Sequence, residues 1–131
     1  MSEHRIKVLF VDDEEHNRNA FYANFRMKYK IYLCASGAEG LQRLREMPEI
    51  DIVITDQKMP GMTGMEFLEK IDSSIAPFRI VVTAHRDMTI LDEAMKSGKI
   101  NDYYDKPWNI DALERIIDNA IKTILEKRSG K

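Results

Sequence analysis

Short apolar runs alternate along the chain with longer segments of mixed polarity. The runs are rich in β-branched and aromatic residues, and most lack polar alternation. This pattern is typical of strands that are buried on both faces, as in a parallel sheet. The predicted strands are residues 6–11, 31–35, 50–55, 78–83 and 100–104.

The segments between the runs predict helices. The last of them has the most regular apolar stripe, at i, i+3, i+4, i+7, i+8 and i+11. That stripe consists of Leu113, Ile116, Ile117, Ala120, Ile121 and Ile124. Ser36 with Glu39, and Thr63 with Glu66, form capping-box patterns at two other helix starts. Gly98 is placed to end the fourth helix, and residues 15–29 predict a less regular first helix.

Strict alternation of strands and helices predicts an α/β fold, a doubly wound five-stranded parallel sheet with five helices. Right-handed crossovers then place helices on both faces of the sheet. We expect residues 1–131 to form a single domain with a core at about 5–126. The polar tail, 127–131, is expected to fray.

Composition narrows the classes of function. The chain has 131 residues and a formal net charge of −2, which disfavours direct nucleic-acid binding. Cys34 is the only cysteine, so an intramolecular disulfide and a cysteine zinc site are excluded, and its apolar surroundings predict a buried structural thiol. The sequence contains neither a signal-peptide pattern nor an apolar stretch that could span a membrane. We therefore expect a cytoplasmic domain without membrane contact.

Chemically active side chains follow the predicted strands. Asp12 and Asp13 follow the first, Asp56 follows the third, Thr83 ends the fourth, and Lys106 follows the fifth. Sites in open parallel sheets form beyond the carboxyl ends of the strands. We therefore expect these five side chains to converge at one edge.

Together, these residue types predict phosphoryl-transfer chemistry. Clustered carboxylates repel one another, and a hard divalent cation such as Mg²⁺ or Mn²⁺ removes that cost. Lys106 could neutralise a phosphate oxygen, and Thr83 could donate a hydrogen bond to another. A carboxylate surrounded by these groups can act as the nucleophile. Each residue alone is uninformative, because an aspartate after a strand is commonly only a helix cap.

From about Lys7 to about Leu125 the sequence resembles the receiver domain of two-component response regulators. The motifs that carry the resemblance are Asp12-Asp13, Asp56 followed by Met59-Pro60-Gly61-Met62 and Gly64, Thr83-Ala84, and Lys106-Pro107-Trp108. The resemblance implies the flavodoxin-like receiver fold with strand order 2-1-3-4-5. It also implies a signalling domain that turns over no separate substrate.

The resemblance assigns roles to the acidic residues. Asp56 would be the phospho-acceptor, attacking a phosphohistidine on a sensor histidine kinase or a phosphotransfer protein. Asp13 and Asp56 would ligate the metal directly, and Asp12 would act largely through a water. The backbone carbonyl of Lys58 would be a further ligand.

The resemblance also implies a switch. Thr83 and Lys106 would bind the phosphoryl group, and Thr83 would move with the ring of Tyr103. Because neighbouring strand residues point to opposite faces, Tyr104 would lie on the other side of the sheet. The surface formed by the fourth helix, fifth strand and fifth helix would then bind a downstream output domain or protein, or a second copy of the chain.

Two positions are predicted to tune the acyl phosphate. Lys58 and His85 each lie two residues after a site residue, and we expect them to set the phosphoryl lifetime before self-dephosphorylation. Two solvated loop side chains are the alternative reading. The resemblance further implies a cis Lys106–Pro107 bond, and we expect Trp108 to pack at the edge of the site.

Three other functions fit parts of the pattern. A haloacid-dehalogenase-like phosphohydrolase also uses an aspartyl nucleophile, but with an Asp-x-Asp pair that this chain lacks after its first strand. A flavodoxin-like cofactor binder would have its phosphate repelled by residues 12–15. A pseudo-receiver would act as an interaction module without phosphorylation.

Overall fold

The computed structural model describes residues 5–84, 88–106 and 109–129. It contains a single five-stranded sheet in this described part, with all strands parallel and in the order β2-β1-β3-β4-β5, which confirms the predicted fold class. The strands are β1 (Lys7–Val11), β2 (Lys30–Cys34), β3 (Ile52–Thr55), β4 (Phe78–Thr83) and β5 (Asp102–Asp105). The helices are α1 (Glu15–Phe25), α2 (Gly37–Glu46), α3 (Gly64–Glu69), α4 (Met88–Ser97) and α5 (Ile110–Ser129).

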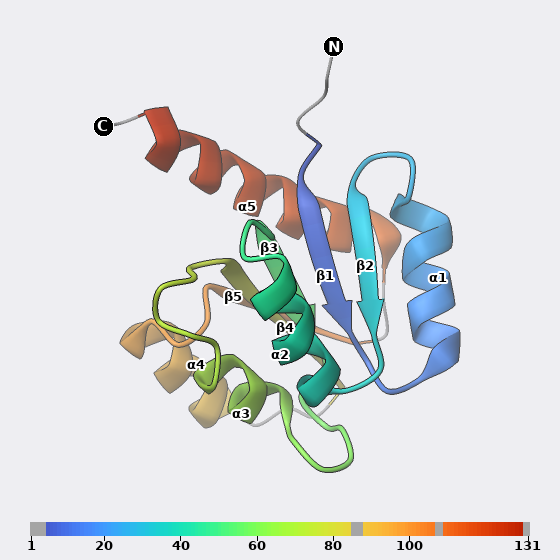
Figure 1. Cartoon of the computed structure of the whole chain (residues 1–131), viewed down its shortest axis with the longest axis vertical. Helices are drawn as coiled ribbons and strands as arrows, with labels where there is room; N and C mark the ends of the chain where they lie inside the picture. The colour runs from blue at the N-terminus through green and yellow to red at the C-terminus, as the bar shows by residue number, and fades with distance from the viewer. Residues whose placement is uncertain (1–4, 85–87, 107–108, 130–131) are drawn as a thin grey trace.

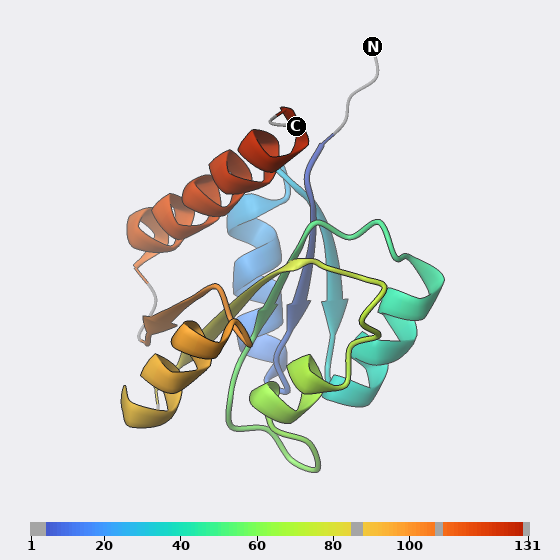
Figure 2. The same cartoon turned by 90° about the vertical axis from the view of Figure 1, so that its left-hand side faces the viewer.

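Helices cover both faces of the sheet, and a separate apolar core lies on each face. One core joins the sheet to α2, α3 and α4 through residues such as Leu44, Phe67 and Leu91. The other joins it to α1 and α5 through residues such as Phe21 and Leu113. Figure 2 shows α5 and α2 on opposite sides of the sheet. The central strands β1 and β3 are buried on both faces, which explains their continuous apolar runs.

The register of the strands brings their carboxyl ends to one end of the molecule. Val11 pairs with Cys34 on one side and Thr55 on the other. The first residue after a strand is hydrogen-bonded to the end of the neighbouring strand at two places. The Asp56 amide donates to the Val11 carbonyl at 3.1 Å, and the Lys106 amide donates to the Thr83 carbonyl at 2.9 Å. The start of β1 and the end of α5 lie at the opposite end (Figure 1).

The capping residues predicted from the sequence lie at the expected helix ends, with small differences in their hydrogen bonds. Thr63 and Glu66 form a reciprocal capping box at α3. The Ser36 side chain accepts from the Glu39 amide, but the Glu39 carboxylate accepts from the Ala35 amide. Gly98 has a φ of +82°, a conformation suited to glycine after a helix.

The first helix is shorter than predicted. It ends at Phe25 and not near residue 29, because the guanidinium of Arg5 donates to the carbonyls of Arg26 (2.7 Å) and Tyr29 (2.9 Å). These long-range contacts turn the chain toward β2. Most strand bounds also differ from the prediction by one or two residues.

The last helix is longer than expected. The described part of the polar tail, residues 127–129, is helical and continues α5. Arg128 forms an ion pair with Asp51, at the start of β3, and this contact holds the last turn of the helix against the sheet. Among the described helices, none has the length and hydropathy needed to cross a bilayer.

Candidate functional site

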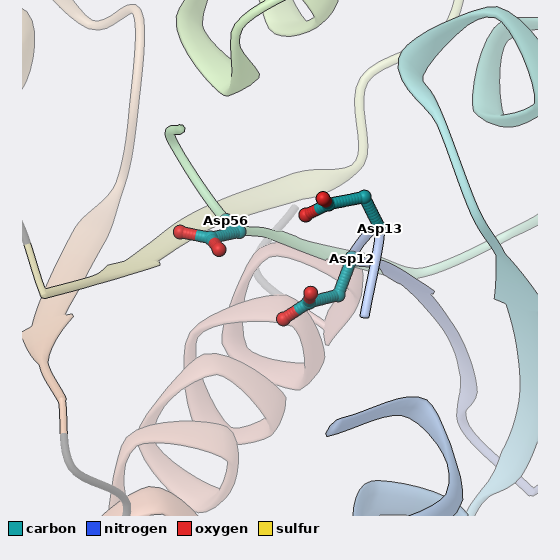
Figure 3. Close-up of side chains that lie close together, drawn as sticks. All are labelled: Asp12, Asp13 and Asp56. Carbon is teal, nitrogen blue, oxygen red and sulfur yellow. The ribbon is translucent and has the colours of Figure 1, made fainter. Parts of the chain in front are cut away.

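Three carboxylates meet where β1 and β3 end. One oxygen from each of Asp12, Asp13 and Asp56 lies within 4.8 Å of the others. Figure 3 shows the three carboxyl groups at the same space between the two strand ends. Asp12 is 1% exposed, whereas Asp13 is exposed to solvent, so the cluster is closed on its inner side and open on its outer side.

Lys106 joins the cluster from the end of β5. Its Nζ lies 3.0 Å from Asp56 Oδ2 and 3.5 Å from Asp12 Oδ2. The sequence places these residues far apart, and the parallel sheet brings them together as expected. The ammonium partly compensates the negative charge and stands beside the carboxylate that the sequence predicts as nucleophile.

The pKa values of this pair follow from burial and charge. Burial raises the pKa of Asp56 above its ordinary value, while the hydrogen bond and charge of Lys106 act in the opposite direction. Burial alone would lower the pKa of Lys106, but the hydrogen bond and charge of Asp56, with Asp12, outweigh it and raise that pKa. Lys106 therefore carries its positive charge at neutral pH.

The first helix holds Asp12 in place. The Glu14 amide donates to Asp12 Oδ1 at 2.9 Å, and Asn17 Nδ2 donates to Oδ2 at 3.1 Å. Arg18 donates to the Asp12 backbone carbonyl at 2.9 Å. Sequence reasoning missed Asn17 and Arg18. Their signal is weak, because a polar residue in the first turns of an exposed helix is ordinary.

The start of α3 packs directly on the backbone of Asp56. A Cβ added at Gly64 would lie 2.2 Å from the Asp56 carbonyl oxygen. Gln57 connects the two segments, because its carbonyl accepts from the Gly64 amide (2.9 Å) and its side chain accepts from the Met65 amide (2.8 Å). Sequence reasoning gave Gln57 no role.

The predicted switch residues lie on the neighbouring strands. Thr83 is 1% exposed at the end of β4. Tyr103 packs against the core that contains α4, and its hydroxyl donates to Asp92 Oδ1 of that helix at 3.1 Å. Burial and this hydrogen bond raise the pKa of Tyr103. Tyr104 packs against the opposite core, so the predicted alternation of the two rings is confirmed.

Other predicted residues are less closely tied to the site. The Lys58 side chain is exposed in the loop after Asp56. His85, Pro107 and Trp108 lie outside the described residues, so their predicted roles and the cis bond remain predictions. Cys34 is 3% exposed in the core, as expected of a structural thiol, and burial raises the pKa of that thiol.

The donor set fits a hard divalent cation. The cluster offers only carboxylate oxygens, which Mg²⁺ and Mn²⁺ prefer, and the exposed side leaves room for the waters that Mg²⁺ keeps. Lys106 approaches from the Asp56 side. A cluster of carboxylates with an ammonium beside it is the kind of arrangement that phosphoryl-transfer sites use.

Comparison with known proteins identifies the family. The family model for the response regulator receiver domain matches residues 8–118. The chain therefore belongs to the response regulator receiver domain family, a family of signalling domains in two-component systems. This membership takes precedence over the phosphohydrolase and flavodoxin-like alternatives.

Similar proteins include both short and long chains. The chain is 30% identical to sporulation initiation phosphotransferase F of Bacillus subtilis, covering 95% of this chain and 97% of that one. It is 28% identical to the hydrogenase transcriptional regulatory protein HoxA of Cupriavidus necator, covering 93% of this chain but 25% of that protein. A receiver domain from Clostridium thermocellum has 33% identity and a TM-score of 0.82, covering 92% of this chain and 98% of that one. The chain thus spans about a quarter of the length of the HoxA protein.

Proposed function

We propose that this receiver domain accepts a phosphoryl group on Asp56. The observation that carries the proposal is the position of Lys106 Nζ, 3.0 Å from Asp56 Oδ2, within a cluster of three carboxylates. At this distance from Asp56, the Lys106 ammonium could neutralise an oxygen of a phosphoryl group on Asp56 without a change in its own position. An aspartate that served only as a helix cap would not need this ammonium.

The reaction uses the groups at the edge of the sheet. An Asp56 carboxylate oxygen attacks the phosphorus of a phosphohistidine on a sensor histidine kinase or phosphotransfer protein. The new O–P bond forms as the P–N bond breaks, and the bonding electron pair leaves with the imidazole. Water later cleaves the acyl phosphate, which returns the carboxylate and releases inorganic phosphate.

Asp12, Asp13, Asp56 and the Lys58 carbonyl would hold Mg²⁺ or Mn²⁺. When bound, the metal supplies charge neutralisation for the incoming phosphoryl group. Asn17 and the Glu14 amide hold Asp12 in the orientation that the cluster requires. Lys58 lies two residues after Asp56, and His85 lies two residues after Thr83. We propose that these two side chains set the lifetime of the acyl phosphate.

Phosphorylation would be read out through Thr83 and Tyr103. The added charge and acceptor oxygens favour movement of the Thr83 hydroxyl toward Asp56. The Tyr103 ring, now held outward by Asp92, could then turn inward. The face made by α4, β5 and α5 would change its affinity for a partner, which is a population shift between two states.

The output partner is a downstream protein or an output domain, or a second copy of the chain, and the encounter with the kinase would take place in the cytoplasm. The transcriptional regulatory proteins among the relatives support control of an output domain. The similarity to a sporulation phosphotransferase supports control of a separate downstream protein equally. An unphosphorylated interaction module is the second candidate.

The test is the intact mass of the protein after incubation with acetyl phosphate. We expect one added phosphoryl group in the presence of Mg²⁺, and none with EDTA or in the Asp56→Asn variant. A phosphoryl group that is still acquired by Asp56→Asn would contradict the proposal. Lack of an adduct on the wild type in both acetyl phosphate and a beryllofluoride trap would favour the interaction module.

A further inference from the structure

Gln57, the residue after the acceptor, joins Asp56 to α3 through three hydrogen bonds. Its backbone amide donates to Asp56 Oδ1 at 2.8 Å. Its carbonyl accepts from the amide of Gly64 at 2.9 Å, and its side-chain Oε1 accepts from the amide of Met65 at 2.8 Å. Gly64 and Met65 are the first two residues of α3. Gln57 therefore satisfies two helix amides that have no partner within the helix.

The remaining amides of the first turn are satisfied by Thr63. Its hydroxyl accepts from the Glu66 amide at 3.1 Å, and its carbonyl accepts from the Phe67 amide at 2.9 Å. Helix α3 has only six residues, so it has little stability of its own. Its first turn therefore depends on these caps and on packing.

The same turn holds the acceptor backbone from one side. A Cβ at Gly64 would be 2.2 Å from the Asp56 carbonyl oxygen, which shows how closely the two backbones approach. The Thr55 hydroxyl also donates to that oxygen, at 2.8 Å. The peptide between Asp56 and Gln57 is thus fixed between β3 and the start of α3.

We propose that Gln57 is a positioning residue for phosphoryl transfer to Asp56. By capping Met65, its side chain keeps the first turn of α3 seated on the acceptor peptide. That turn closes the loop of residues 58–63, which begins with the Lys58 carbonyl. The side chain acts through α3 and does not reach the phosphoryl group. The inference rests on the proposed function of Asp56 and assigns a new residue to it.

A purely structural role for Gln57 makes a different prediction. Gln57 also lines a hollow of about 330 Å³ between α3 and α4, together with Met65, Ile90 and Ala94. If it only fills space there, any side chain of the same length should serve. If it positions the acceptor, the replacement must keep a hydrogen-bond acceptor at the end of the side chain.

Three variants separate these roles. Gln57→Met keeps the length of the side chain but removes the acceptor for the Met65 amide. Gln57→Glu keeps an acceptor oxygen and serves as the conservative rescue. Gln42→Met makes the same replacement at an exposed position of α2, away from the site, and is the matched control.

Three readouts are measured on each variant: the rate of phosphorylation by acetyl phosphate at saturating Mg²⁺, the affinity for Mg²⁺ by NMR titration, and hydrogen exchange of the Met65 amide. In Gln57→Met we expect about tenfold faster exchange at Met65, from the lost hydrogen bond. We expect a phosphorylation rate lower by about tenfold, because the displaced acceptor is poorly aligned. Gln57→Glu should stay within about threefold of the wild type, and Gln42→Met should match it.

The outcomes distinguish this inference from the proposed function. A wild-type rate and Mg²⁺ affinity in Gln57→Met, with Met65 deprotected, would overturn the positioning role. Equal losses in Gln57→Met and Gln57→Glu would also overturn it, since the acceptor oxygen would then be irrelevant. If the wild type accepts no phosphoryl group, the proposed function fails, and the Mg²⁺ affinity and exchange data still decide the role of Gln57.

Discussion

Substituting Gly64 by alanine tests whether the start of α3 fixes the acceptor. The backbone of Gly64 is not in the left-handed region, since only Gly61 and Gly98 have positive φ among the described residues. Helix propensity alone would make Gly64→Ala stabilising by about 1 kcal/mol. The contact with Asp56 predicts the opposite sign.

The size of the effect follows from the distance. The new Cβ would lie 2.2 Å from the Asp56 carbonyl oxygen, 3.0 Å from its carbon and 3.1 Å from Gln57 Cα, whereas real Cβ contacts essentially never fall under 3.0 Å. Helix and acceptor backbone must therefore separate by close to 1 Å, and neither is a flexible side chain. Overpacking of this kind costs about 1–3 kcal/mol. A displaced acceptor should also slow phosphorylation by at least about tenfold, since a shift of this size at a reacting group can cost roughly a hundredfold.

Two assays measure the outcome: urea unfolding, and the rate of phosphorylation by acetyl phosphate at saturating Mg²⁺. Gly98→Ala is the matched control, because a Cβ there meets nothing within 4 Å and only the backbone conformation is strained. It should lose about 1 kcal/mol of stability and keep the wild-type rate. If Gly64→Ala is as stable as the wild type and is phosphorylated as fast, the close packing of α3 on Asp56 is not what positions the acceptor.

Three further predictions concern other parts of the molecule. Burial raises the pKa of Asp102, so the folded state binds this proton more tightly than the unfolded state, and stability falls as the pH rises through the pKa of the carboxyl group. Asp102→Asn should therefore add less than about 1 kcal/mol to the stability at pH 7 after solvent screening. In urea unfolding this gain should shrink as the pH is lowered, and a gain that grows would contradict the reasoning. The buried Cys34 thiol, whose pKa is raised by burial, should react with iodoacetamide roughly a hundredfold more slowly in the native protein than in urea. Equal rates would mean that the core around Cys34 opens readily. Asp92→Ala removes the acceptor of the Tyr103 hydroxyl and should raise the population of the inward ring position by about two- to tenfold. NMR of a fluorotyrosine label measures this, and an unchanged spectrum would show that the hydrogen bond to Asp92 does not hold the ring outward.

Much of the fold could be predicted from the sequence because the relevant signals are local. Apolar runs bounded by turns mark the strands, and strict alternation with helices leaves few arrangements of the sheet. Element ends were less predictable, because long-range contacts set them. Arg5 ends the first helix through two carbonyls, and Arg128 extends the last one through its ion pair with Asp51.

The residues of the candidate site also differ in how far the sequence could predict them. Asp12, Asp56 and Lys106 could be found because each follows a strand, and parallel strands bring their ends together. Asn17 and Gln57 could not, because their roles depend on which amide or carboxylate the side chain reaches in the folded chain. Spacing in the sequence does not reveal that reach.

Equilibrium binding of beryllofluoride tests the central claim most directly, because it needs neither a phosphodonor nor a long-lived acyl phosphate. Fluorine NMR of the wild type with beryllofluoride should show a bound signal when Mg²⁺ is present. The signal should be absent with EDTA and in Asp56→Asn, and much weaker in Lys106→Ala, because the acceptor, its carboxylate neighbours and the ammonium act together. A bound signal of equal strength in Asp56→Asn, or in the wild type without a divalent metal, would contradict the assignment of this cluster as the phosphoryl-acceptor site.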